Sequence, residues 1–178
     1  MNPRYPVSTI IIAGSMLGVL LLSGCATTAP KANFSQGMAL GSLIASNDDV
    51  KVRVEAEQNV SVLDAERARI AQLIEAKIAA KKTAILGSGE KKTYEVEVTL
   101  TRYEKGSSVA RLMLAGLGQI HIDAVVRVYV DPDKRKVGEF TIKKTFAWGG
   151  IYGGSTSMED IEVTFAGGIA AALTGQAE

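Results

Sequence analysis

The chain has 178 residues with 20 basic and 19 acidic side chains, so its formal net charge at pH 7 is +1. This balance argues against a nucleic-acid-binding protein, which typically carries a basic surplus on one face. A single histidine and a single cysteine are too few for a metal site built from His and Cys, or for an internal disulfide bond. We therefore expect no metal, no cofactor and no nucleic acid to bind.

Residues 1–24 have the layout of a secretory signal peptide. Arg4 supplies positive charge, the apolar run of residues 7–22 follows, and the small residues Ser23 and Gly24 come directly before Cys25. The apolar run is shorter than the roughly 20 residues that a membrane-spanning helix needs. Because Arg4 is the only charged side chain removed by cleavage, the mature chain from Cys25 onward is formally neutral.

The four residues Leu22-Ser23-Gly24-Cys25 resemble the bacterial lipobox. The resemblance implies cleavage before Cys25 and attachment of S-diacylglyceryl and N-palmitoyl groups to that residue. Several acyl chains together give stable membrane anchoring, whereas a single chain does not. Ala26 follows the cysteine where an Asp would otherwise retain such a protein in the inner membrane. The resemblance therefore implies a lipoprotein of the outer membrane that faces the periplasm.

After the predicted cleavage site, residues 25–49 are predicted to form the lipidated N-terminus and a tether. Residues 26–33 are rich in Ala, Thr and Pro and show no periodicity. Residues 34–49 contain apolar positions that favour a weak helix, but Gly37 and Gly41 interrupt them. A single folded domain is predicted over residues 50–178.

The first elements of this domain are a strand and a long helix. Residues 50–56 alternate between apolar and charged side chains, with Val50, Val52 and Val54 on one face, which is typical of a half-buried strand. Ser61 is a candidate helix N-cap, and the apolar residues from position 63 to 78 recur at helical spacing. We predict a core-facing amphipathic helix that ends near Lys82.

Three further strands and a last helix complete the domain. Period-2 alternation predicts strands at 93–103, 119–130 and 136–146, and a Pro-containing turn at 131–134 joins the last two. Residues 109–118 are predicted as a short helix or an irregular connection, and residues 148–154 as a glycine-rich loop. Apolar residues at helical spacing predict a final helix over 158–173.

These elements follow the order β-α-β-β-β-α. The sequence therefore predicts an α+β fold with a mainly antiparallel sheet of about four strands, in which strands 93–103, 119–130 and 136–146 form a meander. Two helices, at about 63–81 and 158–173, are expected to pack on one face of that sheet.

Within the block from Tyr94 to Leu173, turn glycines and strand residues form a recognisable pattern. Its members are Thr101 to Ser107, Ala110-Arg111, Gly116 and Gly118, Val125 to Tyr129, Val137 to Phe140, Gly149-Gly150, Gly153-Gly154 and Phe165-Ala166. On these residues the block resembles an uncharacterised bacterial family, the domain of unknown function 4410. The resemblance implies no known activity and supplies no catalytic residue.

Few side chains in the domain suggest chemistry. Trp148 and Tyr152 lie among glycines and form a candidate binding surface, although both rings could instead pack over the edge of the sheet. His121 is expected to share a sheet face with Asp123 as a surface polar pair. No arrangement typical of nucleophilic catalysis or of phosphate binding is recognised.

The sequence thus favours a non-enzymatic, lipid-anchored envelope protein with a binding or assembly role. Its expected partners are the membrane, an envelope protein or other copies of the chain. The alternative is an envelope hydrolase or small-ligand carrier that uses carboxylates such as Glu95 or Asp123, which requires those residues to lie in a pocket.

Overall fold

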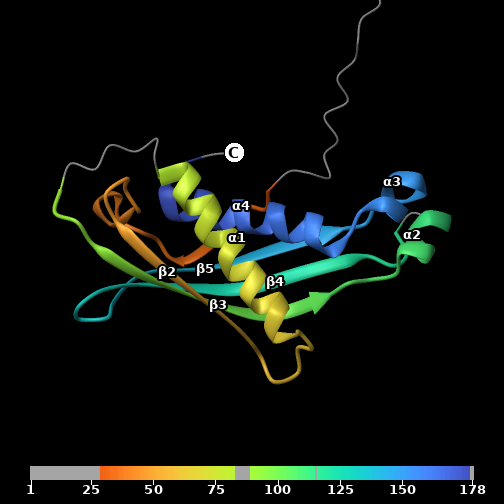
Figure 1. Ribbon diagram of the computed structural model, residues 1–178, viewed down its shortest axis with the longest axis horizontal. Helices are drawn as coiled ribbons and strands as arrows, with labels where there is room; N and C mark the ends of the chain where they lie inside the picture. The colour runs from red at the N-terminus through yellow and green to blue at the C-terminus, as the bar shows by residue number, and fades with distance from the viewer. Residues whose placement is uncertain (1–28, 83–88, 115, 177–178) are drawn as a thin grey trace, which may run out of the picture.

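The computed structural model describes residues 29–82, 89–114 and 116–176. The predicted signal peptide and Cys25 lie outside these residues. The described chain folds into a five-stranded sheet with two long helices on one face and two short helices at one end (Figure 1). The predicted α+β class and the packing of both long helices on one side are confirmed.

The sheet has the spatial order β1-β5-β4-β3-β2 and is antiparallel except at one edge. The three strands predicted as a meander, β3, β4 and β5, pair antiparallel as expected. Strand β2 pairs parallel with β3, and the helix α1 makes the crossover between them. The strand bounds are Asn33–Gln36 for β1, Asp49–Ala56 for β2, Thr93–Glu104 for β3, Ile120–Val130 for β4 and Arg135–Phe146 for β5.

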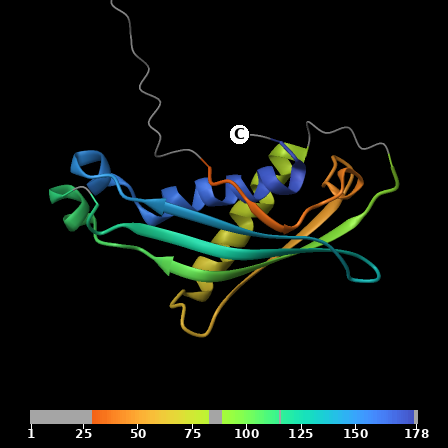
Figure 2. The same cartoon turned by 180° about the vertical axis from the view of Figure 1, so that it is seen from behind.

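The core lies between the sheet and the helices α1 (Asp64–Lys82) and α4 (Met158–Thr174) (Figure 2). The alternating apolar residues of β3 and β4, such as Val96 and Val126, are fully buried, as are Ile70 and Ile74 of α1. The predicted faces of these elements are therefore correct. Burial of such side chains is the main stabilising contribution of a fold of this kind.

The start of α1 differs from the prediction that placed its N-cap at Ser61. The helix begins at Asp64, and the backbone N–H of Leu63 donates to Glu66 Oε2 over 3.0 Å. A glutamate in the first turn that bonds back to the residue before the helix satisfies a donor that would otherwise be unpaired. The cap is therefore supplied by Glu66, and Ser61 lies before it.

The region predicted as a tether also contains regular structure. Residues 33–36 form β1, which pairs antiparallel with β5, and Leu40–Ser42 form a short 3₁₀-helix in place of the weak helix expected there. Phe34 contacts Phe140 of β5 with ring centroids 5.0 Å apart. The segment before β1 crosses α4, where the carbonyl oxygen of Pro30 lies against Gly168.

Two short helices lie at the end of the sheet where β3 ends and β4 begins (Figures 1 and 2). Residues 108–113 form α2 (Ser108–Met113), which agrees with the short-helix alternative. The glycine-rich segment predicted as a loop contains the helix α3 (Gly150–Ser155). The prediction of a loop from these glycines is wrong, because they allow the helix to pack closely against its neighbours.

The close approach of the N-terminal segment to α4 depends on Gly168, which leads to a prediction. A Cβ atom at this position would lie 2.4 Å from Pro30 O and 2.9 Å from Ile142 Cδ1. We expect Gly168→Ala to reduce the free energy of unfolding, because overpacking costs about 1–3 kcal/mol and the gain in helix propensity is about 1 kcal/mol. Urea denaturation measures the difference, with Gly41→Ala as the control, since a Cβ there meets no atom within 4 Å. Equal stability of the two variants would contradict the expectation.

Candidate interaction surface

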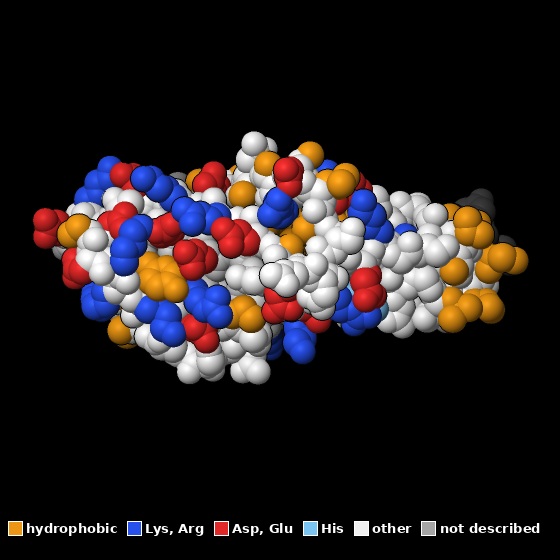
Figure 3. Space-filling view, turned by 90° about the horizontal axis from the view of Figure 1, so that it is seen from below, with side chains coloured by type: hydrophobic (Ala, Val, Ile, Leu, Met, Phe, Trp, Pro, Cys, Tyr) orange, Lys and Arg blue, Asp and Glu red, His pale blue; other side chains and the backbone are white. Residues whose placement is uncertain are grey.

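Exposed apolar side chains gather at one end of the molecule. We call residues 106–114, 116–118 and 147–157, which include α2 and α3, the α2–α3 tip. Eight of the twelve large hydrophobic residues that are exposed in the described chain belong to it. Figure 3 shows apolar side chains gathered at one end, apart from the mixed charges on the rest of that face. The eight are Val109, Leu112, Met113, Leu114, Leu117, Trp148, Ile151 and Tyr152.

Arg111 holds the tip together from inside. It is the only charged residue of the tip sequence, and it is only 2% exposed. Its guanidinium donates to four backbone carbonyls from separate segments. The acceptors are Gly118 O at 2.6 Å, Gly153 O at 2.8 Å, Thr156 O at 2.9 Å and Lys105 O at 3.4 Å. The planar, multidentate guanidinium suits such a role, which a lysine ammonium cannot reproduce. Burial lowers the pKa of Arg111, and the group remains charged at neutral pH because the usual arginine pKa is so high.

Glycines let α2 and α3 come into contact. A Cβ atom on Gly154 would lie 3.1 Å from Leu112 Cβ, and one on Gly153 would lie 2.1 Å from Trp148 O. The second approach is too close for any side chain, so Gly153 is required by the backbone path itself. The glycine-rich stretch therefore serves the packing of the tip.

Trp148 and Tyr152, the two residues predicted as a binding surface, both lie on the tip. Both rings are partly exposed, and one of them also packs against the end of the sheet. Trp148 is 53% exposed and Tyr152 is 47% exposed. The ring of Tyr152 also contacts buried Phe146 edge-on, with centroids 6.0 Å apart. Tyr152 is thus anchored to the end of the sheet while part of its ring faces outward. The neighbouring Leu112, Leu114 and Ile151 were missed because exposure of apolar residues cannot be read from a sequence.

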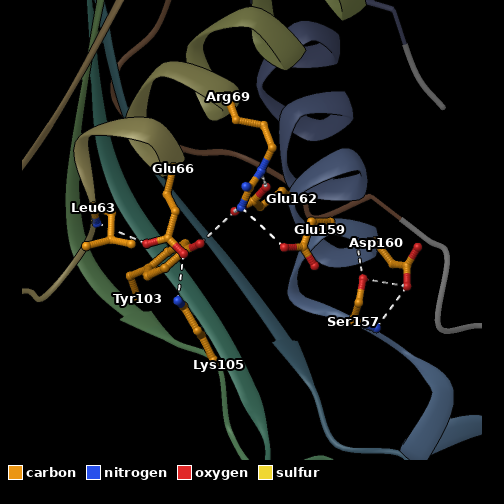
Figure 4. Close-up of polar contacts among 9 residues, drawn as sticks. All are labelled: Leu63, Glu66, Arg69, Tyr103, Lys105, Ser157, Glu159, Asp160 and Glu162. Atoms are coloured by element: carbon orange, nitrogen blue, oxygen red, sulfur yellow. Dashed lines mark hydrogen bonds and ion pairs between the residues drawn. The ribbon is translucent and has the colours of Figure 1, made fainter.

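At the base of the tip, a buried polar cluster connects α1, β3 and α4 (Figure 4). Glu162 is fully buried and receives two hydrogen bonds from Arg69, at 2.7 and 2.8 Å. The hydroxyl of Tyr103 donates to the same carboxylate over 2.6 Å. Bidentate pairing with arginine and a third donor compensate a buried carboxylate for its lost hydration. Burial and the bond to Glu162 raise the pKa of the Tyr103 phenol well above its usual value.

A second acid, Glu66, completes this cluster. Its carboxylate pairs with Lys105 Nζ at 2.6 Å and accepts the N–H of Leu63. Burial alone would raise the pKa of Glu66, but Lys105 and the Leu63 amide together outweigh it and the pKa is lowered. The nearby start of α4 carries a capping box formed by Ser157 and Asp160. Each polar group named here therefore has a structural partner.

The carboxylates considered for catalysis do not meet. Glu95 forms ion pairs with Arg53 and Lys134 on the sheet face opposite the helices. In the register of the sheet Glu95 lies opposite Tyr129, six residues from Asp123, which separates the two acids by about 20 Å at ~3.4 Å per residue. The pocket that the hydrolase alternative requires is not formed by these two residues.

His121 shares the less buried face of β4 with Asp123 as predicted, but it forms its hydrogen bond with a residue of β5 instead. Its Nδ1 atom lies 2.9 Å from Thr145 Oγ1, the residue directly opposite on β5. The cross-strand neighbour is closer than the neighbour two residues away on the same strand, which explains the difference. Burial and the nearby Arg102 guanidinium lower the pKa of His121. Within the described residues no group of three or more His, Cys, Asp or Glu side chains is arranged to hold a metal ion.

Beside the cluster lies an open hollow of about 360 Å³, lined by Lys105, Arg111 and Ser157 among others. All three of these polar groups already have partners within the chain, because Lys105 pairs with Glu66, Arg111 is bound to carbonyls and Ser157 to Asp160. The hollow therefore offers few unused donors to a ligand.

None of the helices in the described ranges has the length and apolar character needed to cross a membrane.

The role of Arg111 can be tested by replacing it with Met, which has similar length but no donors. A buried carbonyl left unpaired costs about 1–3 kcal/mol, so we expect amide hydrogen exchange in α2 and α3 to accelerate roughly ten- to hundredfold. Exchange in β3 and β4 should change little, because their core is separate from the tip. Arg102→Met is the control, since Arg102 is partly exposed and bonds only to Glu104 among the described contacts. Unchanged exchange in α2 and α3 would show that Arg111 does not hold the tip.

Comparison with known proteins gives the family and the fold. Two solved structures of the PelC dodecamer from Paraburkholderia phytofirmans, one of them a point variant, have similar folds. The variant aligns with a TM-score of 0.54 and 12% identity over 84% of this chain and 98% of the other. The second structure aligns with a TM-score of 0.51 and 9% identity over 84% and 99%. No curated protein matches the chain. Residues 39–150 match the profile of the domain of unknown function DUF4410, and the chain belongs to this family.

Proposed function

We propose that this protein is a lipid-anchored, non-enzymatic component of the bacterial cell envelope that makes contact through its α2–α3 tip. The observation that carries the proposal is the tip itself, which exposes eight large apolar side chains while its single charged residue is buried. Contiguous apolar surface of this kind mostly marks a contact site in soluble domains. The hydrogen bonds of Arg111 to the backbone carbonyls suit that role, because they preorganise the tip and a preorganised surface loses little conformational freedom on binding.

The anchor in this proposal is Cys25. The signal-like segment and the residues before the cysteine support it, and Ala26 supports placement in the outer membrane, facing the periplasm. Only three residues separate Cys25 from Ala29, the first described residue. The lipid would thus hold the domain close to the membrane surface.

Assembly of several copies is a second part of the proposal. It is supported by the fold shared with PelC, which is named as a dodecamer. Addition of a strand to the β2 edge is a poor mode of assembly, because Glu75 from α1 already accepts the Val52 amide there, over 3.0 Å. The charged residues Lys51, Arg53 and Glu55 on the same edge also discourage strand pairing. Side-chain packing is the more suitable mode.

The anchor is tested by labelling cells with radioactive palmitate. We expect label in the wild-type protein and none in Cys25→Ser, because only the cysteine thiol can receive the diacylglyceryl group that precedes N-acylation. Gel detection of the labelled band gives the readout, and an antibody against the domain shows that both proteins are made. An unlabelled wild-type protein would overturn the proposed anchor.

The contact role of the tip is tested by photo-crosslinking in intact cells. A photoreactive phenylalanine analogue at Ile151, which is 85% exposed on the tip, should capture a neighbouring molecule. The same analogue at Leu40 serves as the matched control, because Leu40 is 89% exposed but lies in the 3₁₀-helix, outside the tip. Adducts at Ile151 and none at Leu40 are expected. Absence of adducts at both sites would overturn the proposed contact role.

A further inference from the structure

We propose that the α2–α3 tip inserts shallowly into the bilayer surface, so that the domain is held at two points. This inference rests on the proposed function in one respect, since it takes the bilayer to be the one that Cys25 enters. It goes further by naming the occupant of the tip as lipid.

The side chains of the tip are those of a membrane interface. Trp148 and Tyr152 have amphipathic rings of the kind enriched at headgroup level, and Leu114 and Ile151 stand 60% and 85% exposed beside them. A protein-binding patch normally has a polar, charged rim around its apolar centre. In the tip sequence the one charged residue is Arg111, which is buried.

The polar groups of the tip are extensively hydrogen-bonded within it, which low-polarity surroundings require. The hydroxyls of Ser155 and Thr156 both donate to Tyr152 O, at 3.1 and 2.9 Å. The Ser107 hydroxyl accepts the Ala110 amide, and the Gly116 amide donates to Ala147 O at 3.1 Å. The carbonyls of Gly118, Gly153 and Thr156 receive the Arg111 guanidinium. The tip can therefore leave water with these bonds intact.

The path of the chain brings the same side of the domain to the membrane. Cys25 is four residues before Ala29, so their Cα atoms are at most about 14 Å apart. The described N-terminal segment, orange in Figures 1 and 2, lies on the helix-covered side of the sheet. Helix α3 lies on that side too. A bilayer that receives the acyl chains of Cys25 is thus placed where the tip can meet it.

The single tryptophan of the chain makes the test direct, because Trp148 lies on the tip and reports only from there. The lipidated full chain is reconstituted into vesicles of phosphatidylethanolamine and phosphatidylglycerol, with or without bromine on the acyl chains. We expect the Trp148 emission to shift to shorter wavelength and to fall roughly twofold or more with brominated lipid, as for a ring at the acyl boundary. Shielding from aqueous iodide is expected as well.

Charge on the tip should remove this signal. Ile151→Asp and Leu114→Asp are expected to restore most of the emission in brominated vesicles, since a carboxylate resists entry into lipid. Leu40→Asp also replaces an exposed apolar residue by Asp, but outside the tip, and it should leave the quenching unchanged. Ile151→Asn, which adds no charge, is a second variant with an expected partial effect. Hydrogen exchange of β3 and β4 shows whether each variant is folded.

Two results would overturn the inference. One is Trp148 emission that brominated lipid does not quench although the acyl chains of Cys25 are verified by mass spectrometry. The other is a shift that follows protein concentration rather than lipid, which would assign the tip to a second copy. Loss of the palmitate label with quenching retained would instead reject the proposed anchor and keep the bilayer contact, so the two proposals fail separately.

Discussion

The hydrogen bonding of the Arg111 guanidinium is the interaction on which the structure of the α2–α3 tip depends. Its four described hydrogen bonds join the end of β3, the start of β4, helix α3 and the segment before α4. The two short helices there bury almost no apolar side chain of their own, because Arg111 is the one buried residue of α2 and Gly153 the one buried residue of α3. A short helix is marginal by itself in water. Multidentate pairing of one buried cation with carbonyls gives the tip a defined shape while leaving its apolar side chains free to make contact.

Much of the fold follows from local patterns in the sequence. Period-2 alternation located β2, β3, β4 and β5 to within a residue or so, since each strand buries one face against the helices. Strand β1 was not predicted, because its four residues, Asn33 to Gln36, contain one apolar side chain and show no alternation. Its pairing with β5 is a long-range interaction. Helix α3 was not predicted either, because Gly150, Gly153 and Gly154 are typical of loops. Only the contact with α2 makes glycine suitable in this helix.

The candidate surface was predicted only in part, for a similar reason. Trp148 and Tyr152 were predictable because they are aromatic residues among glycines. The role of Arg111, which lies within an apolar stretch, was not predictable, because its partners are backbone carbonyls up to 45 residues away. Glu162 occupies the buried side of α4 next to Ile161 and Phe165, and only the fold brings Arg69 and Tyr103 to it. Side-chain chemistry is visible in a sequence, whereas burial and non-local partners are properties of the folded chain.

The proposed second contact of the tip with the bilayer would change what the segment after Cys25 does. An acylated Cys25 alone would let the domain rotate freely about one point. Because only three residues separate Cys25 from Ala29, the anchor would raise the effective concentration of the tip at the surface to about the millimolar range, so that a contact too weak to recruit the free domain would still be populated. Insertion of a few side chains is then sufficient. In the proposed arrangement, with both points fixed, the sheet face opposite the helices would keep one orientation, and its ion pairs, such as Arg127 with Glu139 and Arg53 with Glu95, would be presented away from the bilayer or to neighbouring copies. In this arrangement the apolar end and the charged face of the domain (Figure 3) would have complementary roles, because the first would set the orientation that makes the second available.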